Sequence, residues 1–244
     1  MGGTLVTFSG GVDSTFLAKV AAEALGERAA ALTALSPSMP AAERDEAAAL
    51  AREIGIRYVV VESKELDDPR YASNPENRCY FCKTELFSIA RRKADELGFA
   101  WVVDGTHLDD LKQVRPGRQA AKEWGVRSPL VEAGFTKEDV RRASRQLGLA
   151  TADKPSMACL ASRIPHGTVV TVQRLGQVER CEQGLKRAGF RQVRARFQGD
   201  AVRLELDAAE IGRLADAVVQ AGALTACREA GFGRVWVDLA GYAG

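Results

Sequence analysis

The sequence predicts an α/β protein: a doubly wound parallel sheet followed by a second, smaller α+β domain. Two observations lead to this fold class. Short apolar runs alternate with amphipathic segments over the first 150 residues, which is the pattern of parallel strands connected by helices. Beyond residue 168 the pattern changes to a helix, a hairpin, a helix and a strand. We therefore expect a sheet domain over 1–150, a linker over 151–168 and a small domain over 169–244.

The first domain shows four strand patterns and four helix patterns. The strands are expected over 4–8, 29–35, 57–63 and 100–106, and the helices over 14–26, 40–55, 79–98 and 134–149. The segment 79–98 is expected to begin as a turn before it becomes helical. Thr136 is expected to cap the last of these helices. The polar segment 64–78 contains Pro69 and Pro75 and is predicted to be a loop.

The second domain is predicted from a different arrangement of the same signals. A helix over 171–188 precedes a β-hairpin over 190–207, which we expect to turn at Gly199-Asp200. A helical stretch over 207–230 and a strand over 234–239 complete this domain.

Composition excludes some classes of function. No apolar run among the 244 residues approaches the ~20 residues that span a membrane, and the N-terminus lacks a signal-peptide pattern. We expect a cytoplasmic protein without a membrane partner. The net charge of +2 gives no sign of a nucleic-acid partner. The basic stretch 174–203 is either a solvated helix face or an anion site.

The segment SGGVDST at 9–15 lies between the first strand and the first helix. A glycine turn at a helix N-terminus lets backbone N–H groups approach an anion, although a tight turn alone also needs glycine. The segment lacks the lysine of the loops that bind β- and γ-phosphates. Asp13 is compatible with phosphate if Mg²⁺ lies between them. We therefore predict ATP cleaved between its α- and β-phosphates, with these residues binding the nucleotide: Ser9, Gly10, Gly11, Val12, Asp13 and Ser14.

Other polar residues follow the expected strands at the same edge of the sheet. Ligands bind beyond the carboxyl ends of the strands in doubly wound sheets. Ser36 follows the second strand, and Gly105 and Thr106 end the fourth. We expect these three residues to contribute to the nucleotide site.

Five cysteines, an odd number, argue against a disulfide framework in such a protein. Cys79 and Cys82 have the spacing of a shared metal or redox pair, and Cys159 lies in the predicted linker. Three interpretations stay open: a zinc site completed by Cys159 and His107 or His166, a redox pair, or an iron–sulfur cluster with one open iron. Cys181 and Cys227 lie in predicted helices, and we expect both to be packed.

The motifs resemble those of known families. SGGVDST matches the SGGxDS signature of the PP-loop ATP pyrophosphatases, in the expected strand–loop–helix context. NRCYFCKTELF at 77–87 and DKPSMACLASRIPHGT at 153–168 are similar to the LarE family. These are sulfur transferases that build the nickel-pincer nucleotide cofactor. The resemblance runs from about residue 4 to 170 and weakens toward the C-terminus.

The resemblance implies a PP-loop fold and a reaction. ATP, with Mg²⁺, would adenylate a carboxylate of pyridinium-3,5-dicarboxylic acid mononucleotide, and sulfur would replace AMP to give a thiocarboxylate. In members with three cysteines, residues matching Cys79, Cys82 and Cys159 hold a [4Fe-4S] cluster. In others, the cysteine matching Cys159 gives up its own sulfur, so the sulfur source stays open. The family also implies a trimer-based homo-oligomer.

Arg163 follows Cys159 by four residues and is a candidate to bind the carboxylate or phosphate of the substrate. His107 stands where the family more often has asparagine, and His166 where it often has tyrosine. Two other functions are open: a tRNA thiolase of the same superfamily, and a nucleotide-binding module without catalysis. Salt-sensitive tRNA binding would favour the first, and ATP binding without pyrophosphate release the second.

Overall fold

The computed structural model describes residues 2–112, 115–155 and 158–242. The chain divides into two compact units, and each has its own sheet. The first unit comprises Met1–Tyr71 and Glu76–Met157, and the second comprises Ala72–Pro75 and Ala158–Gly244. The segment predicted as a linker is shared between them. The boundaries expected from the sequence stay predictions, because compact packing does not test whether either part folds alone.

The described part of the first unit contains a four-stranded parallel sheet, which confirms the predicted fold class. Its order is β3-β2-β1-β4, from strands β1 (Gly3–Thr7), β2 (Ala29–Leu35), β3 (Arg57–Glu62) and β4 (Phe99–Val103). All five residues of β1 are buried, as expected for a strand covered on both faces. The carboxyl ends of β1, β2 and β4 consequently lie at one edge.

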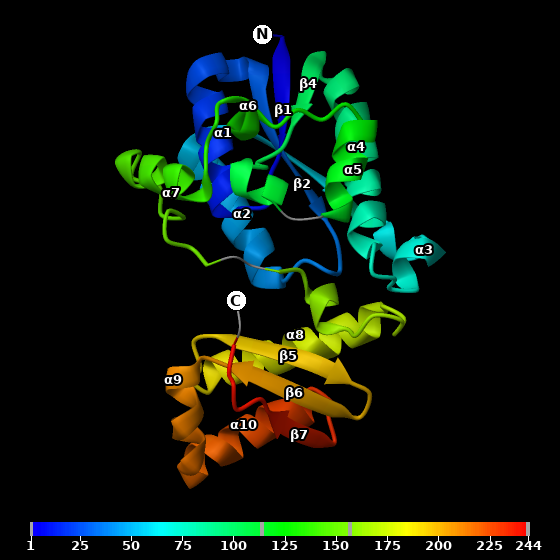
Figure 1. Ribbon diagram of the computed structural model, residues 1–244, viewed down its shortest axis with the longest axis vertical. Coiled ribbons are helices and arrows are strands. Elements are labelled where there is room, and N and C mark those ends of the chain that lie inside the picture. The colour runs from blue at the N-terminus through cyan, green and yellow to red at the C-terminus, as the bar shows by residue number, and fades with distance from the viewer. Residues whose placement is uncertain (1, 113–114, 156–157, 243–244) are drawn as a thin grey trace. The chain divides into compact units, whose positions relative to one another are not determined.

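Helices cover both faces of this sheet (Figure 1). α1 (Val12–Leu25), α2 (Ala41–Ile54) and α7 (Lys137–Gln146) contribute to one core cluster with the sheet. α4 (Arg78–Glu96) packs on the other face, where Ala90 and Ala94 belong to one core cluster with Leu5 and Leu32. α5 (Pro116–Glu123) lies against α4. The sheet is therefore doubly wound.

Two parts of the first unit differ from the prediction. The segment 64–78 is not all loop, since it contains a 3-10 turn (Glu65–Asp67) and the short helix α3 (Pro69–Ala72). α4 already begins at Arg78, so Cys79 and Cys82 lie in its first turns and not in a turn before it. A 3-10 turn (Leu108–Lys112), α5 and α6 (Pro129–Glu132) were not predicted, because such short helices offer too few turns for a periodic signal.

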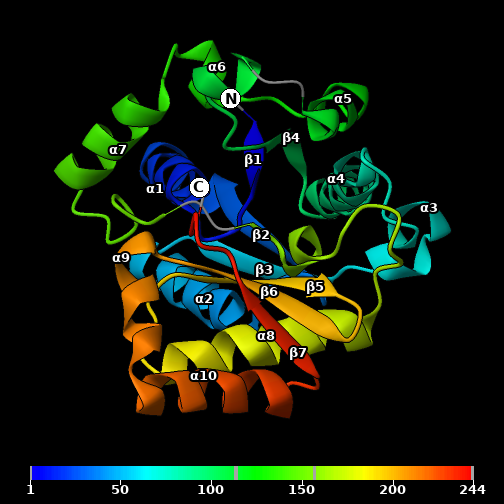
Figure 2. The ribbon, with the colours of Figure 1, turned by 60° about the horizontal axis from the view of Figure 1, so that its bottom comes forward.

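Among residues 158–242, a hairpin and a third strand form the second sheet (Figure 2). β5 (Val193–Gln198) pairs antiparallel with β6 (Ala201–Leu206), and β7 (Arg234–Val237) pairs parallel with β6. The predicted turn is confirmed, because Gln198 pairs with Ala201. α8 (Val172–Arg187) packs on β5 and α10 (Ala217–Glu229) packs on α8.

The predicted helical stretch 207–230 is interrupted. It consists of α9 (Ala208–Ile211), a 3-10 turn (Gly212–Ala215) and α10. Asp216 separates the last two, because its carboxylate accepts the backbone N–H groups of Val218 and Val219 at 2.8 and 3.1 Å and so caps α10.

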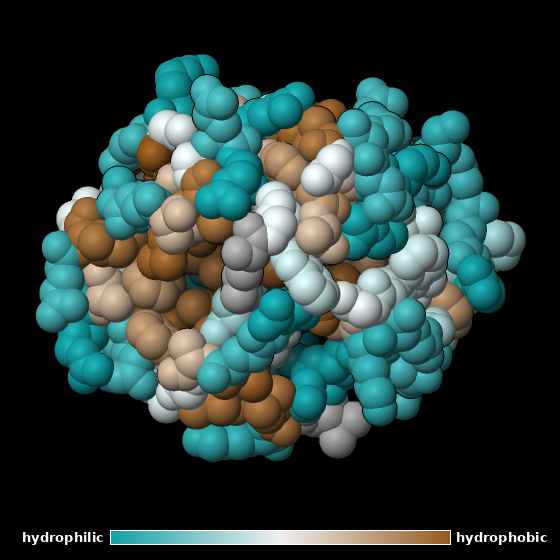
Figure 3. Space-filling model, turned by 90° about the horizontal axis from the view of Figure 1, so that it is seen from above, coloured by the Kyte–Doolittle hydropathy of each residue, from teal (hydrophilic) through white to brown (hydrophobic). Residues whose placement is uncertain are grey.

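No helix in the described residues has the length and apolar character needed to cross a membrane. The face shown in Figure 3 is a mixture of hydrophilic and hydrophobic residues.

Candidate active site

The loop between β1 and α1 is stabilised by hydrogen bonds among its own residues. Ser14 Oγ donates to the carbonyl of Gly11 and accepts the N–H of Ser9, both at 3.2 Å. Gly10 has φ +71°, and a Cβ there would lie 3.3 Å from the Cα of Ala47. Gly11 caps α1 without a side-chain bond, so the first N–H groups of this helix stay available to an anion. Val12 is buried, so only its backbone can face a ligand.

Asp13 forms an ion pair with a lysine that lies far along the chain. Lys137 Nζ lies 2.8 and 2.7 Å from the two carboxylate oxygens of Asp13. The two residues are 124 positions apart, and both side chains are about three-quarters buried. The loop that has no lysine of its own therefore has one supplied by the start of α7, which the sequence analysis missed.

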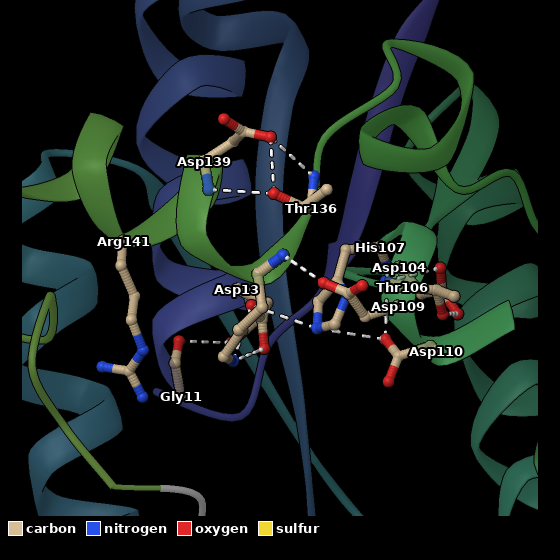
Figure 4. Close-up of polar contacts among 12 residues, drawn as sticks. Gly11, Asp13, Asp104, Thr106, His107, Asp109, Asp110, Thr136, Asp139 and Arg141 are labelled. Atoms are coloured by element: carbon tan, nitrogen blue, oxygen red, sulfur yellow. Dashed lines mark hydrogen bonds and ion pairs between the residues drawn. The ribbon is translucent and has the colours of Figure 1, made fainter. Parts of the chain in front are cut away.

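The first turn of α7 fixes where Lys137 stands. Thr136 and Asp139 form a capping box, in which the Thr136 hydroxyl accepts the Asp139 N–H at 3.2 Å (Figure 4). Asp109 accepts the N–H of Lys137 at 2.8 Å. Hydrogen bonds from Lys112 and then from the Lys137 backbone hold the pKa of Asp109 below its usual value. The Thr136 hydroxyl lowers the pKa of Asp139 in the same way.

Residues after β4 approach the loop closely. A Cβ on Gly105 would lie 3.0 Å from the backbone nitrogen of Ser14, so glycine allows the end of β4 to reach the start of α1. Asp104 is buried and accepts the hydroxyls of Thr106 and Ser128 at 2.8 and 2.7 Å. Its oxygens are already used in holding this turn together.

His107 lies between two carboxylates. Its Nε2 is 3.4 Å from Asp110 Oδ2 and 3.9 Å from Asp13 Oδ1, and Figure 4 shows the three side chains in a row. Arg115 holds the other oxygen of Asp110 at 2.8 Å. The side chain is buried, and its Nδ1 has no hydrogen-bond partner among the described residues. The histidine thus belongs to the Asp13 network.

The loop after β1 and the residues after β4 line a pocket of about 670 Å³ at the carboxyl edge of the sheet. The loop contributes Ser9, Gly11, Asp13 and Ser14. An apolar part of the wall comes from Phe8, Leu32, Ala34 and Met39, and Gly105 and Thr106 line the pocket beside the loop. An apolar recess next to a phosphate loop is suited to a nucleotide, because the base packs against apolar side chains and the phosphates need N–H donors.

Ser36 is not brought to this pocket in the described residues. Its hydroxyl donates to the buried carboxylate of Glu65 and accepts the N–H of Ser38 at 2.9 Å. Ser36 follows β2 as predicted. Its side chain stabilises the turn after the strand and does not line the pocket.

Lys154 ties the segment before Cys159 to the loop. Its Nζ donates to the carbonyl of Gly10 at 3.1 Å and pairs with Glu46 at 2.7 Å. Arg141 donates to the carbonyls of Ala152 and Lys154, at 2.7 and 3.1 Å. Sequence reasoning missed Lys154, although the DKP sequence ahead of Cys159 contains it.

Cys79 and Cys82 lie one helical turn apart at the start of α4. Cys79 is exposed and lines the pocket, whereas Cys82 is partly buried. Neither is in a disulfide. The first unit thus presents a thiol directly at the cavity that contains the loop.

Cys159 lies in the second unit, exposed, at the start of a 3-10 turn (Leu160–Arg163). Arg163 is buried, and its Nε and Nη2 donate to Glu182 at 2.8 and 3.2 Å. Its Nη1 donates to the carbonyls of Ala158 and Cys159 at 2.5 and 3.1 Å. We expected this guanidinium to bind substrate, but it is committed to holding the turn of Cys159.

The remaining cysteines are packed, as expected. Cys181 and Cys227 are fully buried with their sulfurs 3.5 Å apart, and this contact and burial raise the pKa of the Cys181 thiol.

The donor chemistry can be compared with the expected metals. Over residues 2–112, 115–155 and 158–242, no three His, Cys, Asp or Glu side chains gather as a metal site. His166 is exposed in the second unit. The thiols of Cys79, Cys82 and Cys159 are outside disulfides and at least partly exposed, which suits iron–sulfur ligands. The Asp13 carboxylate is a hard oxygen ligand that suits Mg²⁺.

Known proteins resemble this chain. The family model of NAD synthase matches residues 1–86, which include the loop and both thiols of α4. An uncharacterized protein of Synechocystis is 45% identical over 98% of this chain and 89% of its own length. The pyridinium-3,5-bisthiocarboxylic acid mononucleotide synthase of Lactiplantibacillus plantarum is 38% identical over 85% of this chain and 75% of its own length.

A more distant similarity connects the chain to another enzyme. One component of the glutamine-hydrolyzing GMP synthase of Methanosphaerula palustris is 26% identical over 59% of this chain and 50% of its own length.

Proposed function

The chain belongs to the family of the pyridinium-3,5-bisthiocarboxylic acid mononucleotide synthases, the LarE family, and from this membership we propose that it is an ATP-dependent sulfur transferase. Its acceptor would be a pyridinium-3,5-dicarboxylic acid mononucleotide. A carboxylate oxygen of the acceptor attacks the α-phosphorus of ATP, and pyrophosphate leaves. A sulfur nucleophile then attacks the carbonyl carbon of the adenylate, and AMP leaves with the oxygen.

One observation carries the proposal: an aspartate, paired with a distant lysine, stands in a phosphate loop at the N-terminus of α1. The N–H groups of Val12 and Asp13, in the first turn of α1, would bind phosphate oxygens. Asp13 would hold Mg²⁺, which neutralises the charge of the leaving pyrophosphate. A cleavage that releases pyrophosphate needs positive charge at the leaving group. The loop has no cationic residue of its own, so Mg²⁺ and Lys137 would supply this charge.

Lys137 has a role in this scheme. In the structure its ammonium forms an ion pair with the Asp13 carboxylate. We propose that Lys137 releases Asp13 when the nucleotide binds and moves onto the pyrophosphate oxygens. Its backbone is held by Asp109 and by the capping box of α7, so only the flexible side chain has to move.

The thiols supply the second half-reaction. Cys79, Cys82 and Cys159 would hold a [4Fe-4S] cluster that supplies an open iron site for sulfide. The segment before Cys159 is anchored to the loop by Lys154, which donates to the carbonyl of Gly10. Arg163 positions the backbone of Cys159 through its two carbonyl contacts. These features support a thiol delivered to the activated carboxylate.

The aspartate is tested by Asp13→Asn. We expect acceptor-dependent release of pyrophosphate to fall by about a hundredfold or more, because the neutral amide cannot hold a metal ion against the phosphates. Asp45→Asn, an exposed acid of α2, is the control and should keep the wild-type rate. Pyrophosphate release by Asp13→Asn at the control rate would remove the basis of the proposal.

A further inference from the structure

A lysine with no carboxylate partner faces the pocket. Cys79, Lys83 and Phe87 follow one another at four-residue intervals on α4, so they form one stripe of that helix. All three line the pocket. The ammonium of Lys83 lies 5.6 Å from the centre of the Phe87 ring, and among the described residues no carboxylate is within ion-pair distance of it.

The aliphatic part of the Lys83 side chain packs against the neighbouring helix α5. Gly117 is the second residue of α5, and a Cβ there would lie 2.8 Å from Lys83 Cγ and 3.5 Å from the carbonyl oxygen of Cys79. Only glycine lets the first turn of α5 pack so closely on this part of α4. The lysine is therefore held beside Cys79 by packing, while its charge has no counter-ion in the described part of the chain.

The pocket has walls of opposite charge. Asp13, Asp104 and Asp110 line it near the loop and the end of β4. Lys83 lines it from α4, and Arg115 and Arg118 from the start of α5. Arg115 is paired with Asp110, and Arg118 donates to the carbonyl of Leu111 at 3.3 Å. The positive end of the eight-residue helix α5 reinforces the basic wall.

The two reactants of the proposed reaction both carry negative charge. ATP bears its charge on the phosphates at the loop, and an acceptor with carboxylates and a phosphate would be repelled from them unless a cation lies nearby. Lys83 has neither a counter-ion nor a hydrogen-bond acceptor among the described residues, so its ammonium is available to such a ligand. We propose that Lys83 binds an anionic group of the acceptor, next to Cys79, and so forms the acceptor subsite of the pocket. This inference rests on the proposed function.

The anionic group is either the phosphate or a ring carboxylate, and three probes separate them. Nicotinic acid mononucleotide carries both groups, nicotinamide mononucleotide only the phosphate, and nicotinic acid riboside only the carboxylate. Each is titrated calorimetrically into full-length protein saturated with Mg²⁺ and α,β-methylene-ATP. The affinity for the ATP analogue is measured separately and reports on folding and on the loop.

For Lys83→Ala we expect nicotinic acid mononucleotide to bind about ten- to a hundredfold more weakly, with unchanged affinity for the ATP analogue. Lys83→Arg should restore most of the affinity. Lys93→Ala, on the same helix but outside the pocket lining, is the control and should bind as the wild type does. A loss that extends to nicotinamide mononucleotide identifies the phosphate, and one that extends to the riboside identifies the carboxylate.

Two results would overturn the inference in different ways. If wild type binds the probes and Lys83→Ala binds all of them equally well, the subsite is wrong and the proposed function stands. If wild type binds the ATP analogue but none of the probes, the acceptor class in the proposed function fails together with the subsite.

Discussion

Lys137 Nζ contacts both carboxylate oxygens of Asp13, in the loop between β1 and α1. A lysine within the loop would be read directly from the sequence, but this one comes from 124 residues away. The local signal was present, since Thr136 and Asp139 mark a helix start with Lys137 as its first residue. What the sequence could not tell is where that start lies, because this depends on α7 packing against α1.

Lys137→Ala tests the proposed exchange. We expect the kcat for pyrophosphate release to fall about 100-fold, because one preorganised charge at the leaving group is lost. Lys137→Arg should recover part of this rate, since it keeps the charge. The exposed Lys122→Ala serves as the control. An unchanged kcat for Lys137→Ala would assign the lysine to Asp13 alone, as a structural counter-ion.

Arg163 was predicted to bind the substrate because it follows Cys159 by four residues. In the structure its side chain is buried, and its hydrogen-bond partners limit what else it can bind. A guanidinium that donates to Glu182 and to two backbone carbonyls has few donors left for a substrate. Sequence proximity to a thiol indicates a shared site, whereas burial and partners determine whether a residue contacts ligand or holds others in place.

At the scale of elements, the clamp between Arg163 and Glu182 connects the Cys159 turn, α8 and β5. Glu182 also accepts the N–H of Ala195 at 3.0 Å. Removing one charge of a buried pair leaves the other uncompensated. For Arg163→Ala we expect the free energy of unfolding of the second unit to fall by about 3 kcal/mol or more.

Urea unfolding followed by the fluorescence of Trp236 measures this change in a Trp101→Phe, Trp124→Phe background. Trp236 then reports on the second unit alone. The double variant Arg163→Met, Glu182→Leu should lose less stability than Arg163→Ala, since it buries no lone charge. If Arg163→Ala unfolds at the same urea concentration as the Trp101→Phe, Trp124→Phe parent, the ion pair between Arg163 and Glu182 does not stabilise the second unit.

Longer elements were predictable and shorter ones were not. The strands and helices of the first unit carry clear sequence patterns, and their alternation predicted the parallel, doubly wound sheet. α5 and α6 have eight and four residues, too few for a pattern, yet α5 supplies part of the basic wall of the pocket. The start of α4 was placed too late, because CYFC resembles a turn while its residues are helical.

At the scale of the whole molecule, the sequence predicted two parts with different patterns, and each has its own sheet. The prediction also brought the loop, Gly105 and Thr106 to one pocket, since all follow strands at one sheet edge. It could not supply partners that come from elsewhere in the fold, such as Lys137, Lys154 and Lys83. Lys137 and Lys83 carry chemistry proposed for the site, and Lys154 anchors the segment before Cys159.

The central claim is that ATP is split between its α- and β-phosphates to activate a carboxylate for sulfur. The direct measurement is analysis of the products formed from ATP, Mg²⁺, a sulfide source and pyridinium-3,5-dicarboxylic acid mononucleotide under anaerobic conditions. The account predicts AMP and pyrophosphate that appear only with the acceptor, and a mononucleotide whose mass shows oxygen exchanged for sulfur. ADP and phosphate, or ATP cleavage that is indifferent to the acceptor, would contradict it.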